Sequence, residues 1–312
     1  MAVLIGLLVT ISSHACDICN LYAEIMPDDY KHSIGVYTRH RMLRGTRMGV
    51  FYKQPRGGFH QPLPGQGIPF YGEYNAAENY NVLELQGRFM FTDRISAIIG
   101  VPYAVSNSFV NGGLNARAAG LGDPYLLIGY QLLGTYYGDT TNLLNHRLTI
   151  RGGVKAPLGS TNTTWQGYDI DHDLQPGTGS TDFLMQLEYL VQYGKWGVGV
   201  VGNHKLNTVG ADHYRYGNTT NGTLQLMYFA DSGPMTVVPR AGFYGEHANR
   251  DHDRGEVFEW SGGSVLYAEA GLGFMSGVFS MGFSYQHALK NQWNYDQIPV
   301  INRVTFFSRV SF

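Results

Sequence analysis

Cysteine, histidine and aspartate occur in this chain at spacings suited to binding a metal ion. Cys16 and Cys19 are the only two cysteines and form a C-x-x-C pair. Two Asp-His-Asp triplets lie far apart in segments without a regular pattern, and their members are Asp171, His172, Asp173, Asp251, His252 and Asp253. Thiolate, imidazole and carboxylate groups are common ligands of divalent cations. Metal handling is therefore one interpretation. The triplets could instead belong to solvated polar loops. The two cysteines could instead form a disulfide or take part in redox chemistry, or Cys16 could be lipidated.

Nucleophilic catalysis is the second chemistry that the residue types allow. Ser284 stands three residues before His287, and His204 follows Asn203, but neither pair has the surroundings of a known hydrolase motif. The C-x-x-C pair is followed by Asn20, where attachment of a c-type haem needs histidine. We therefore expect neither an enzyme nor a bound cofactor.

The N-terminal residues have the pattern of a secretory signal. The apolar run 3–11 is far shorter than the roughly 20 residues of a membrane helix, and Ser13-His14-Ala15 has the small-x-small form of a cleavage site. No lysine or arginine precedes the run, which leaves an upstream start open. We predict a signal peptide over residues 1–15, a periplasmic lead with the C-x-x-C pair over 16–31, and one domain over 32–312.

The composition favours strands joined by tight turns. The 312 residues include 41 glycines, and 13% of the chain is aromatic whereas only 15% is charged. The formal net charge of −2 provides no basic surface for phosphates, so we expect no nucleic-acid partner.

Apolar and polar residues alternate over most of the chain, as they do in strands with two different faces. In the last stretch, residues 300–312, one face is mostly apolar and the other carries Arg303 and Arg309. The stretch ends on Phe312. A terminal strand ending on an aromatic residue is typical of barrels that the outer-membrane assembly machinery recognises, so we expect that machinery as a partner. We also expect this strand to pair with the first one, residues 32–42.

About twelve such stretches occur, joined by connections that are alternately long and short. The long ones are predicted over 43–79, 107–121 and 158–179 and in three later segments. Aromatic residues crowd the short turns, as an interfacial girdle requires: Phe89, Phe91, Tyr193, Trp196, Tyr228, Phe229, Phe274 and Phe279. We predict an all-β fold, a single transmembrane antiparallel β-barrel of about twelve strands of the outer-membrane type. Its termini would be periplasmic and its outer face would contact the lipids of a Gram-negative outer membrane; a soluble β-sandwich is the alternative.

If the apolar faces meet lipid, the polar faces line the lumen. The predicted pore-lining residues are Glu84, Arg88, Arg147, Arg151, Lys155, Asp182, Glu188, Arg240, Glu246, Glu269, Arg303 and Arg309, and Lys205 shares their face. Both signs are present, so the set is either an ion-paired plug or a polar pathway that selects solutes by charge.

Three motifs carry a resemblance to a known family: Gly120-Leu121-Gly122-Asp123, the stretch 153–159 that ends in Pro157-Leu158-Gly159, and the stretch 176–182 that ends in Ser180-Thr181-Asp182. In this order they resemble signatures of the "MetA-pathway of phenol degradation" outer-membrane transporters, over roughly residues 121–191. The resemblance implies an outer-membrane barrel that passes small, often hydrophobic or aromatic, solutes by passive diffusion. Two hypotheses remain: such a channel, or a non-conducting structural or binding barrel linked to metal handling. The motif glycines either bend the barrel rim or act directly in the pore.

Overall fold

The computed structural model describes residues 31–53, 59–60, 68–135, 143–295 and 297–312. The predicted signal peptide, Cys16 and Cys19, and the Pro- and Gly-rich stretch 61–67 lie outside the described residues.

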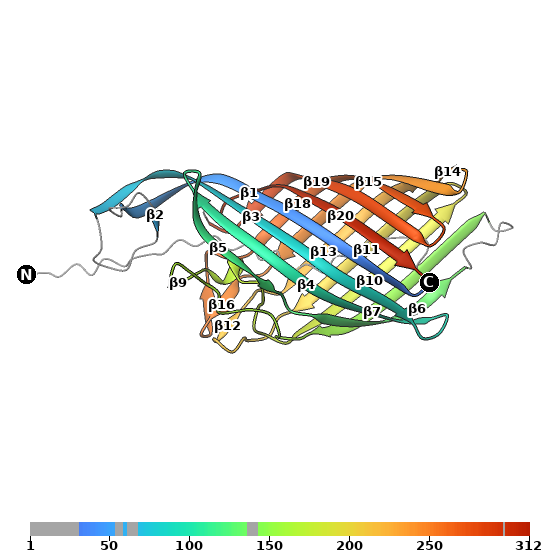
Figure 1. Ribbon diagram of the computed structural model, residues 1–312, viewed down its shortest axis with the longest axis horizontal. Helices are drawn as coiled ribbons and strands as arrows, with labels where there is room; N and C mark the ends of the chain where they lie inside the picture. Colours follow the sequence, from blue (N-terminus) through green and yellow to red (C-terminus); the bar gives the residue numbers. More distant parts are fainter. Residues whose placement is uncertain (1–30, 54–58, 61–67, 136–142, 296) are drawn as a thin grey trace, which may run out of the picture.

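Twelve antiparallel strands form a closed barrel, as predicted (Figure 1). Each strand pairs with the next and the last pairs with the first. In order they are β1 (Ser33–Lys53), β3 (Ile68–Met90), β4 (Ile95–Val110), β6 (Tyr125–Gly134), β7 (Leu144–Lys155), β10 (Asp182–Tyr193), β11 (Trp196–Leu206), β13 (Thr219–Tyr228), β15 (Met235–Ala248), β18 (Gly263–Ser276), β19 (Phe279–Trp293) and β20 (Val300–Ser311). Closure gives every strand of the barrel wall a neighbour on both sides, and β1 and β3 continue beyond the wall as a two-stranded hairpin.

The remaining elements are short and belong mainly to the connections. They are β2 (Phe59–His60), β5 (Gly113–Leu121), β8 (Thr164–Trp165), β9 (Tyr168–Asp169), the 3-10 helix η1 (His172–Leu174), β12 (Tyr214–Arg215), β14 (Ala230–Ser232), β16 (Asp251–Asp253) and β17 (Glu256–Phe258). β9, β12 and β16 lie at one end of the barrel, the loop end, and the C-terminus lies at the other, the turn end (Figure 1). Within the described residues, no helix is long and apolar enough to cross a membrane.

The barrel closes between β1 and β20, and the predicted pairing of the last strand with the first is confirmed. Their register runs from Ser33 opposite Ser311 to Leu43 opposite Val300, with one irregularity after Met42. Beyond the ladder, the Phe312 amide donates a hydrogen bond of 2.9 Å to the His32 carbonyl.

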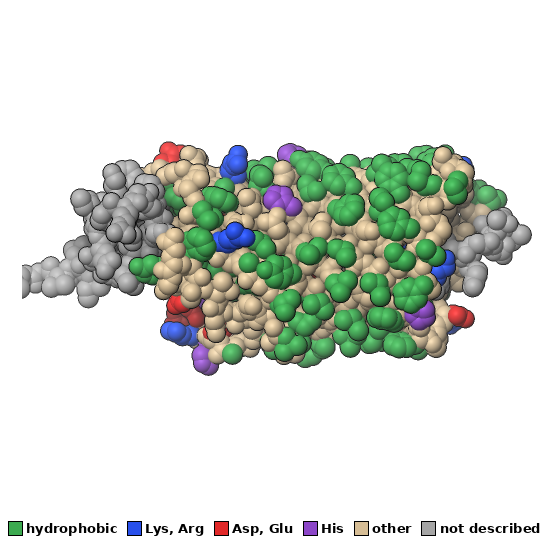
Figure 2. Space-filling model, viewed as in Figure 1, with side chains coloured by type: hydrophobic (Ala, Val, Ile, Leu, Met, Phe, Trp, Pro, Cys, Tyr) green, Lys and Arg blue, Asp and Glu red, His purple; other side chains and the backbone are tan. Residues whose placement is uncertain are grey.

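The barrel wall has an apolar outer face and a polar inner face. On β20, Phe306 and Val310 are 42% and 46% exposed, whereas Arg303 and Arg309 are buried. The same alternation in the other strands covers the outside with hydrophobic side chains (Figure 2). A soluble barrel would bury these side chains, so the arrangement is that of a barrel surrounded by lipid.

Most of the predicted girdle residues do lie on the outside at the short turns. Phe91, Tyr193 and Trp196 are among the most exposed aromatic side chains of the chain. The prediction is wrong for Phe229, which is 6% exposed and packs inside against Gly197. Phe229 follows β13 at a position that continues its inward face, two residues after the buried Met227.

Two predicted loops are largely strand. The segment 43–79 was expected to be irregular, but β1 and β3 remain paired as far as Lys53 and Ile68. The segment 107–121 contains β5, which returns along β4 after a turn at Asn111 and Gly112, both with positive φ. In the second hairpin the glycine that suggested a loop marks only the turn, at Gly112, and not the whole segment. The connection 158–179 is mostly irregular, as predicted.

Candidate functional site

The candidate site is the interior of the barrel together with the connection 156–181. The structure places all twelve predicted pore-lining residues on the inner face: Glu84 and Glu246 are half-buried and the other ten are buried, as is Lys205. Strand alternation alone positions them, because every second residue of a strand points to the same face.

Near the middle of β7 and β10, one glutamate joins two arginines. Glu188 accepts from Arg147 Nη2 at 2.5 Å and from Arg151 Nη1 at 2.8 Å. Arg151 also donates to the side-chain oxygen of Gln186 at 2.7 Å, and Gln186 donates to Asn203 at 2.8 Å. The network ties three neighbouring strands together across the inner wall.

A second carboxylate, on β15, joins two arginines that come from β1 and β20. Glu246 accepts from Arg41 at 3.1 Å and from Arg303 at 2.8 Å. The Arg303 guanidinium also lies 4.9 Å from the ring centre of Tyr244 and 5.1 Å from that of Tyr267. Burial makes such cation–π contacts stronger than they are at an exposed site.

These two tyrosines belong to an apolar and aromatic group inside the barrel, here called the loop-end cluster. Its buried members are Leu43, Ala76, Tyr80, Ala116, Leu174, Tyr244, Val265, Tyr267, Ile298 and Val300. They come from five barrel-wall strands, from β5 and from two loops, and Trp165, Ile170 and Trp293 pack against them. Aromatic side chains with polar tips can bury their rings and still satisfy their hydroxyl groups, as Tyr80 does by donating to Glu78 at 2.8 Å.

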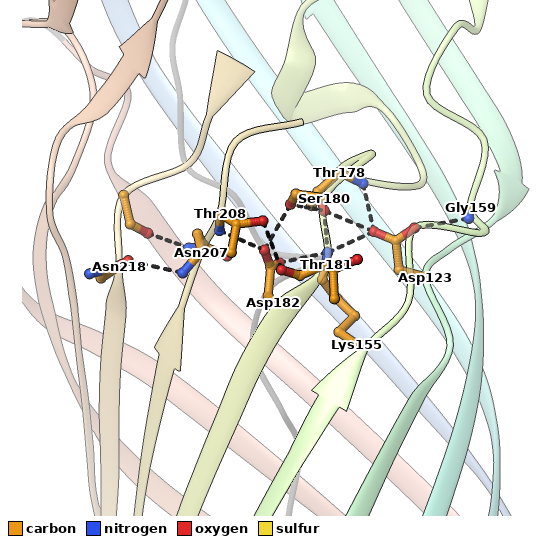
Figure 3. Close-up of polar contacts among 11 residues, drawn as sticks. Asp123, Lys155, Gly159, Thr178, Ser180, Thr181, Asp182, Asn207, Thr208 and Asn218 are labelled. Carbon is orange, nitrogen blue, oxygen red and sulfur yellow. Dashed lines mark hydrogen bonds and ion pairs between the residues drawn. The ribbon is translucent and has the colours of Figure 1, made fainter. Parts of the chain in front are cut away.

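Lys155 anchors the connection 156–181 to the barrel wall (Figure 3). Its ammonium group lies 2.7 Å from a carboxylate oxygen of Asp123 and 2.7 Å from one of Asp182, and it also donates to the Thr178 hydroxyl. Asp123 in turn accepts from the backbone amides of Gly159 at 2.9 Å and Thr178 at 2.7 Å. One buried lysine and one buried aspartate thus hold both ends of this connection.

The three motifs of the family resemblance meet at this anchor. Asp123 belongs to the first, Lys155 and Gly159 to the second, and Thr178 and Asp182 to the third. A Cβ added to Gly159 would lie 2.7 Å from the backbone of Gly122, so the two segments approach too closely for any larger residue. The glycines therefore serve this close packing, and no direct role in the pore is needed to explain them.

The middle of the connection enters the mouth of the barrel. Leu174 joins the loop-end cluster, and the Tyr216 hydroxyl donates to the His172 carbonyl at 2.7 Å. Asp173, in η1, is 1% exposed, and neither of its carboxylate oxygens has a hydrogen-bond partner. Burial, followed by the nearby charges of Asp251 and Glu78, raises the pKa of Asp173 well above its ordinary value.

The predicted metal ligands are placed at the loop end but contact other groups. Asp251 accepts from the Tyr214 hydroxyl and the Gly217 amide, both at 2.6 Å. His252 lies against Arg215, and His172 stacks on Tyr214 with the ring centres 4.0 Å apart. No group of three or more histidine, cysteine, aspartate or glutamate residues suited to a metal ion occurs among the described residues. A role for Cys16 and Cys19 stays a prediction, because they lie outside that part of the chain.

The candidate catalytic pair is separated by the barrel wall. Ser284 is buried on the inner face of β19, whereas His287 is exposed. The two side chains point to opposite faces because they are an odd number of residues apart.

Sequence reasoning missed three groups of the site. Tyr244 and Tyr267 lie two residues from Glu246 and Glu269 on the same strand faces, so the alternation that found the glutamates could also have found the tyrosines. Asp123 ends the first of the three motifs. Its pairing with Lys155 joins residues 32 positions apart, so no local sequence pattern indicates it. The burial of Asp173 also depends on tertiary packing.

Comparison with known proteins supports the fold. No protein-family model and no curated protein match the chain, so the family resemblance stays a prediction. Among solved structures, the COG4313 outer membrane channel from Pseudomonas putida F1 is similar, with a TM-score of 0.61 and 16% identity over 93% of this chain and 100% of that one. The β domain of the Bordetella autotransporter BrkA is similar with a TM-score of 0.50 and 12% identity, over 90% of this chain and 100% of that one. At these identities the likeness establishes the fold alone, that of an outer-membrane β-barrel.

Proposed function

We propose that this protein is an outer-membrane channel that lets small solutes, hydrophobic or aromatic ones among them, diffuse passively through its lumen. The observation that carries the proposal is the polar lining of the barrel. Charged and amide side chains line the inner wall from Arg309 near the turn end to Lys155 near the mouth. A barrel filled only for stability would gain at least as much from apolar side chains, since desolvating buried ion pairs is costly.

The solute class follows from the loop-end cluster. The rings of Tyr80, Tyr244 and Tyr267 belong to this cluster at the loop end of the lumen, beside the Glu246 carboxylate and its two arginines. Apolar surfaces favour solutes with an apolar body. The similar fold of a protein described as an outer membrane channel agrees with this proposal.

The proposed placement puts the turn end in the periplasm. Residues 1–15 would direct export and be removed, residues 16–31 would form the lead, and residues 32–312 the barrel. Short turns on the side of the C-terminus are usual for the periplasmic side of outer-membrane barrels. Phe312 would present the last strand to the assembly machinery.

Planar-bilayer recording tests the channel. The purified full chain should produce discrete current steps after insertion, and protein that has been irreversibly heat-denatured should not. Silence from folded, inserted protein would contradict the channel and favour the alternative, a non-conducting structural or binding barrel.

A further inference from the structure

A groove lies on the outer face of the barrel, across β13, β15, β18 and β19. Its volume is about 420 Å³ and its surface is mostly apolar. The hollow exists because two outward-facing glycines, Gly222 on β13 and Gly245 on β15, pair directly with each other. A Cβ added to Gly222 would approach only the Val201 carbonyl oxygen, at 3.4 Å. One added to Gly245 would approach only Leu266, at 3.9 Å, so the space outside both glycines is open.

The groove lies where the apolar band of the outer face ends. Towards the turn end, the neighbouring outward row is Leu224 opposite Phe243, whose side chains are 51% and 52% exposed. Towards the loop end, the neighbouring outward row is polar on all four strands: Thr220, His247, Ser264 and Gln292. In an outer-membrane barrel, such a change from apolar to polar marks the level of the lipid headgroups. The groove therefore has an apolar side towards the membrane interior and a polar side at the membrane surface.

A single cation, Lys290 on β19, lines the groove. Register places it beside Leu266, in the same row as the two glycines, and its side chain is exposed. Within the described chain, this side chain has neither an ion pair nor a hydrogen bond. The acid of the lining, Glu246, faces the lumen and is paired there with two arginines. The charge that the groove offers at headgroup level is therefore positive.

We propose that the groove binds one membrane lipid with an anionic phosphate headgroup, taken from the leaflet at the loop end. An acyl chain fills the space outside Gly222 and Gly245 and continues along Leu224 and Phe243. The phosphate lies at the polar row, within reach of Lys290. Burial of apolar surface holds the chain, and the ammonium group selects the charge of the headgroup. This lipid site does not depend on whether the barrel conducts.

Photo-cross-linking locates the lipid. The purified full chain in neutral detergent is mixed with phosphatidylglycerol that carries a diazirine on one acyl chain, and the cross-linked residues are mapped by mass spectrometry. We expect the cross-links to concentrate at Leu224, Phe243 and Leu266. Gly245→Leu fills the hollow and should abolish them. Gly152→Leu, the matched control, adds the same side chain at an outward glycine of β7 that also has no atom within 4 Å, and should keep them.

Two results would overturn the site. One is an even spread of cross-links around the outer face of the native chain, and the other is native cross-linking of the groove in Gly245→Leu. Folding of each variant is checked by the shift in gel mobility between unheated and heated samples.

Lys290→Met tests the preference for an anionic headgroup. The variant removes the charge without removing a contact between described residues, so the fold should be kept. Unlabelled phosphatidylglycerol should displace the photoreactive lipid from the native groove at lower concentration than phosphatidylcholine does. In Lys290→Met the two lipids should compete equally. Equal competition already in the native chain, or an unchanged difference in the variant, would contradict the role of Lys290.

Native mass spectrometry separates a lipid from a second copy of the chain as the occupant. The detergent-solubilised native chain should appear as a monomer that retains one phosphatidylglycerol, and Gly245→Leu should lose this lipid. Dimers that disappear in Gly245→Leu would assign the groove to a second copy and overturn the proposal.

Discussion

At the scale of single residues, the contacts of Lys155 hold the connection 156–181 to the barrel wall. Its ammonium group pairs with both Asp123 and Asp182, and Asp123 also accepts from the backbone amides of Gly159 and Thr178, near the two ends of the connection 156–181. All three side chains are buried. Removing the cation from such a group leaves uncompensated carboxylates in a poorly solvated place.

Lys155→Met is therefore expected to loosen the connection. It keeps most of the side-chain volume but removes the charge, so the folded barrel should lose about 3–5 kcal/mol of unfolding free energy. The measurement is urea unfolding in lipid vesicles, combined with limited proteolysis of residues 156–181. Lys290→Met, at an exposed cation of β19, is the control. Native stability and native protease resistance in Lys155→Met would show that the ion pairs do not hold the connection.

Asp173 should make docking of the connection depend on pH. Its buried carboxyl faces Asp251 on β16 and Glu78 on β3, with Asp171 on its own segment and the cation of Arg41 on β1. Because its folded-state pKa is raised, its contribution to docking is complete below the ordinary aspartate pKa of about 3.9. The contribution is lost as pH rises through the higher folded-state pKa, since the ionised carboxylate is repelled.

Asp173→Asn tests this dependence. The native protein should become more sensitive to proteolysis at residues 156–181, and conduct more, as pH rises. The asparagine variant has no proton to lose and should show a flatter response. A native response that is independent of pH, or an equally steep response in the variant, would refute the role of Asp173.

At the scale of elements, the inward glycines let bulky side chains lie flat on the inner wall. A Cβ added to Gly282 on β19 would lie 2.1 Å from the Phe307 ring on β20. Gly100 on β4 accommodates Tyr125 of β6 in the same way, at 2.3 Å. No shift of the ring is available without disturbing the packed neighbours.

Gly282→Ala should destabilise the barrel by about 1–3 kcal/mol, the usual effect of overpacking. The control is Gly202→Ala on β11, where an added Cβ meets no atom within 4 Å. Unfolding free energies in the same lipid should separate the two variants. Equal values for both would mean that the inner wall relaxes around the extra methyl group.

Element prediction from the sequence succeeded where two faces of a strand meet different surroundings. The wall strands alternate because lipid lies on one side and the lumen on the other, and this gave the number of strands and the facing of Arg303 and Arg309. It failed for the long hairpin of β1 and β3 and for β5, whose glycines and prolines resemble loop residues. The inward course of residues 156–181 has no periodic pattern and depends on contacts distant in sequence.

At the scale of the whole molecule, closure depends on the last strand. β20 pairs with β1 over its length, and Phe312 stacks near His32 with ring centres 5.8 Å apart. We expect that deletion of Phe312 causes failure of assembly and leaves selectivity unaltered in the few barrels that form. Outer-membrane levels of the deletion variant, compared with Phe312→Tyr, measure this. Normal levels of the deletion variant would contradict the prediction.

In the proposed channel, the connection that Lys155 anchors occupies the loop end of the polar lumen. The most direct test is single-channel recording of the native chain and Lys155→Met in the same lipid. We predict discrete steps for the native chain and larger or longer openings for the variant, because its connection leaves the mouth more often. Silence from both folded proteins would contradict the account.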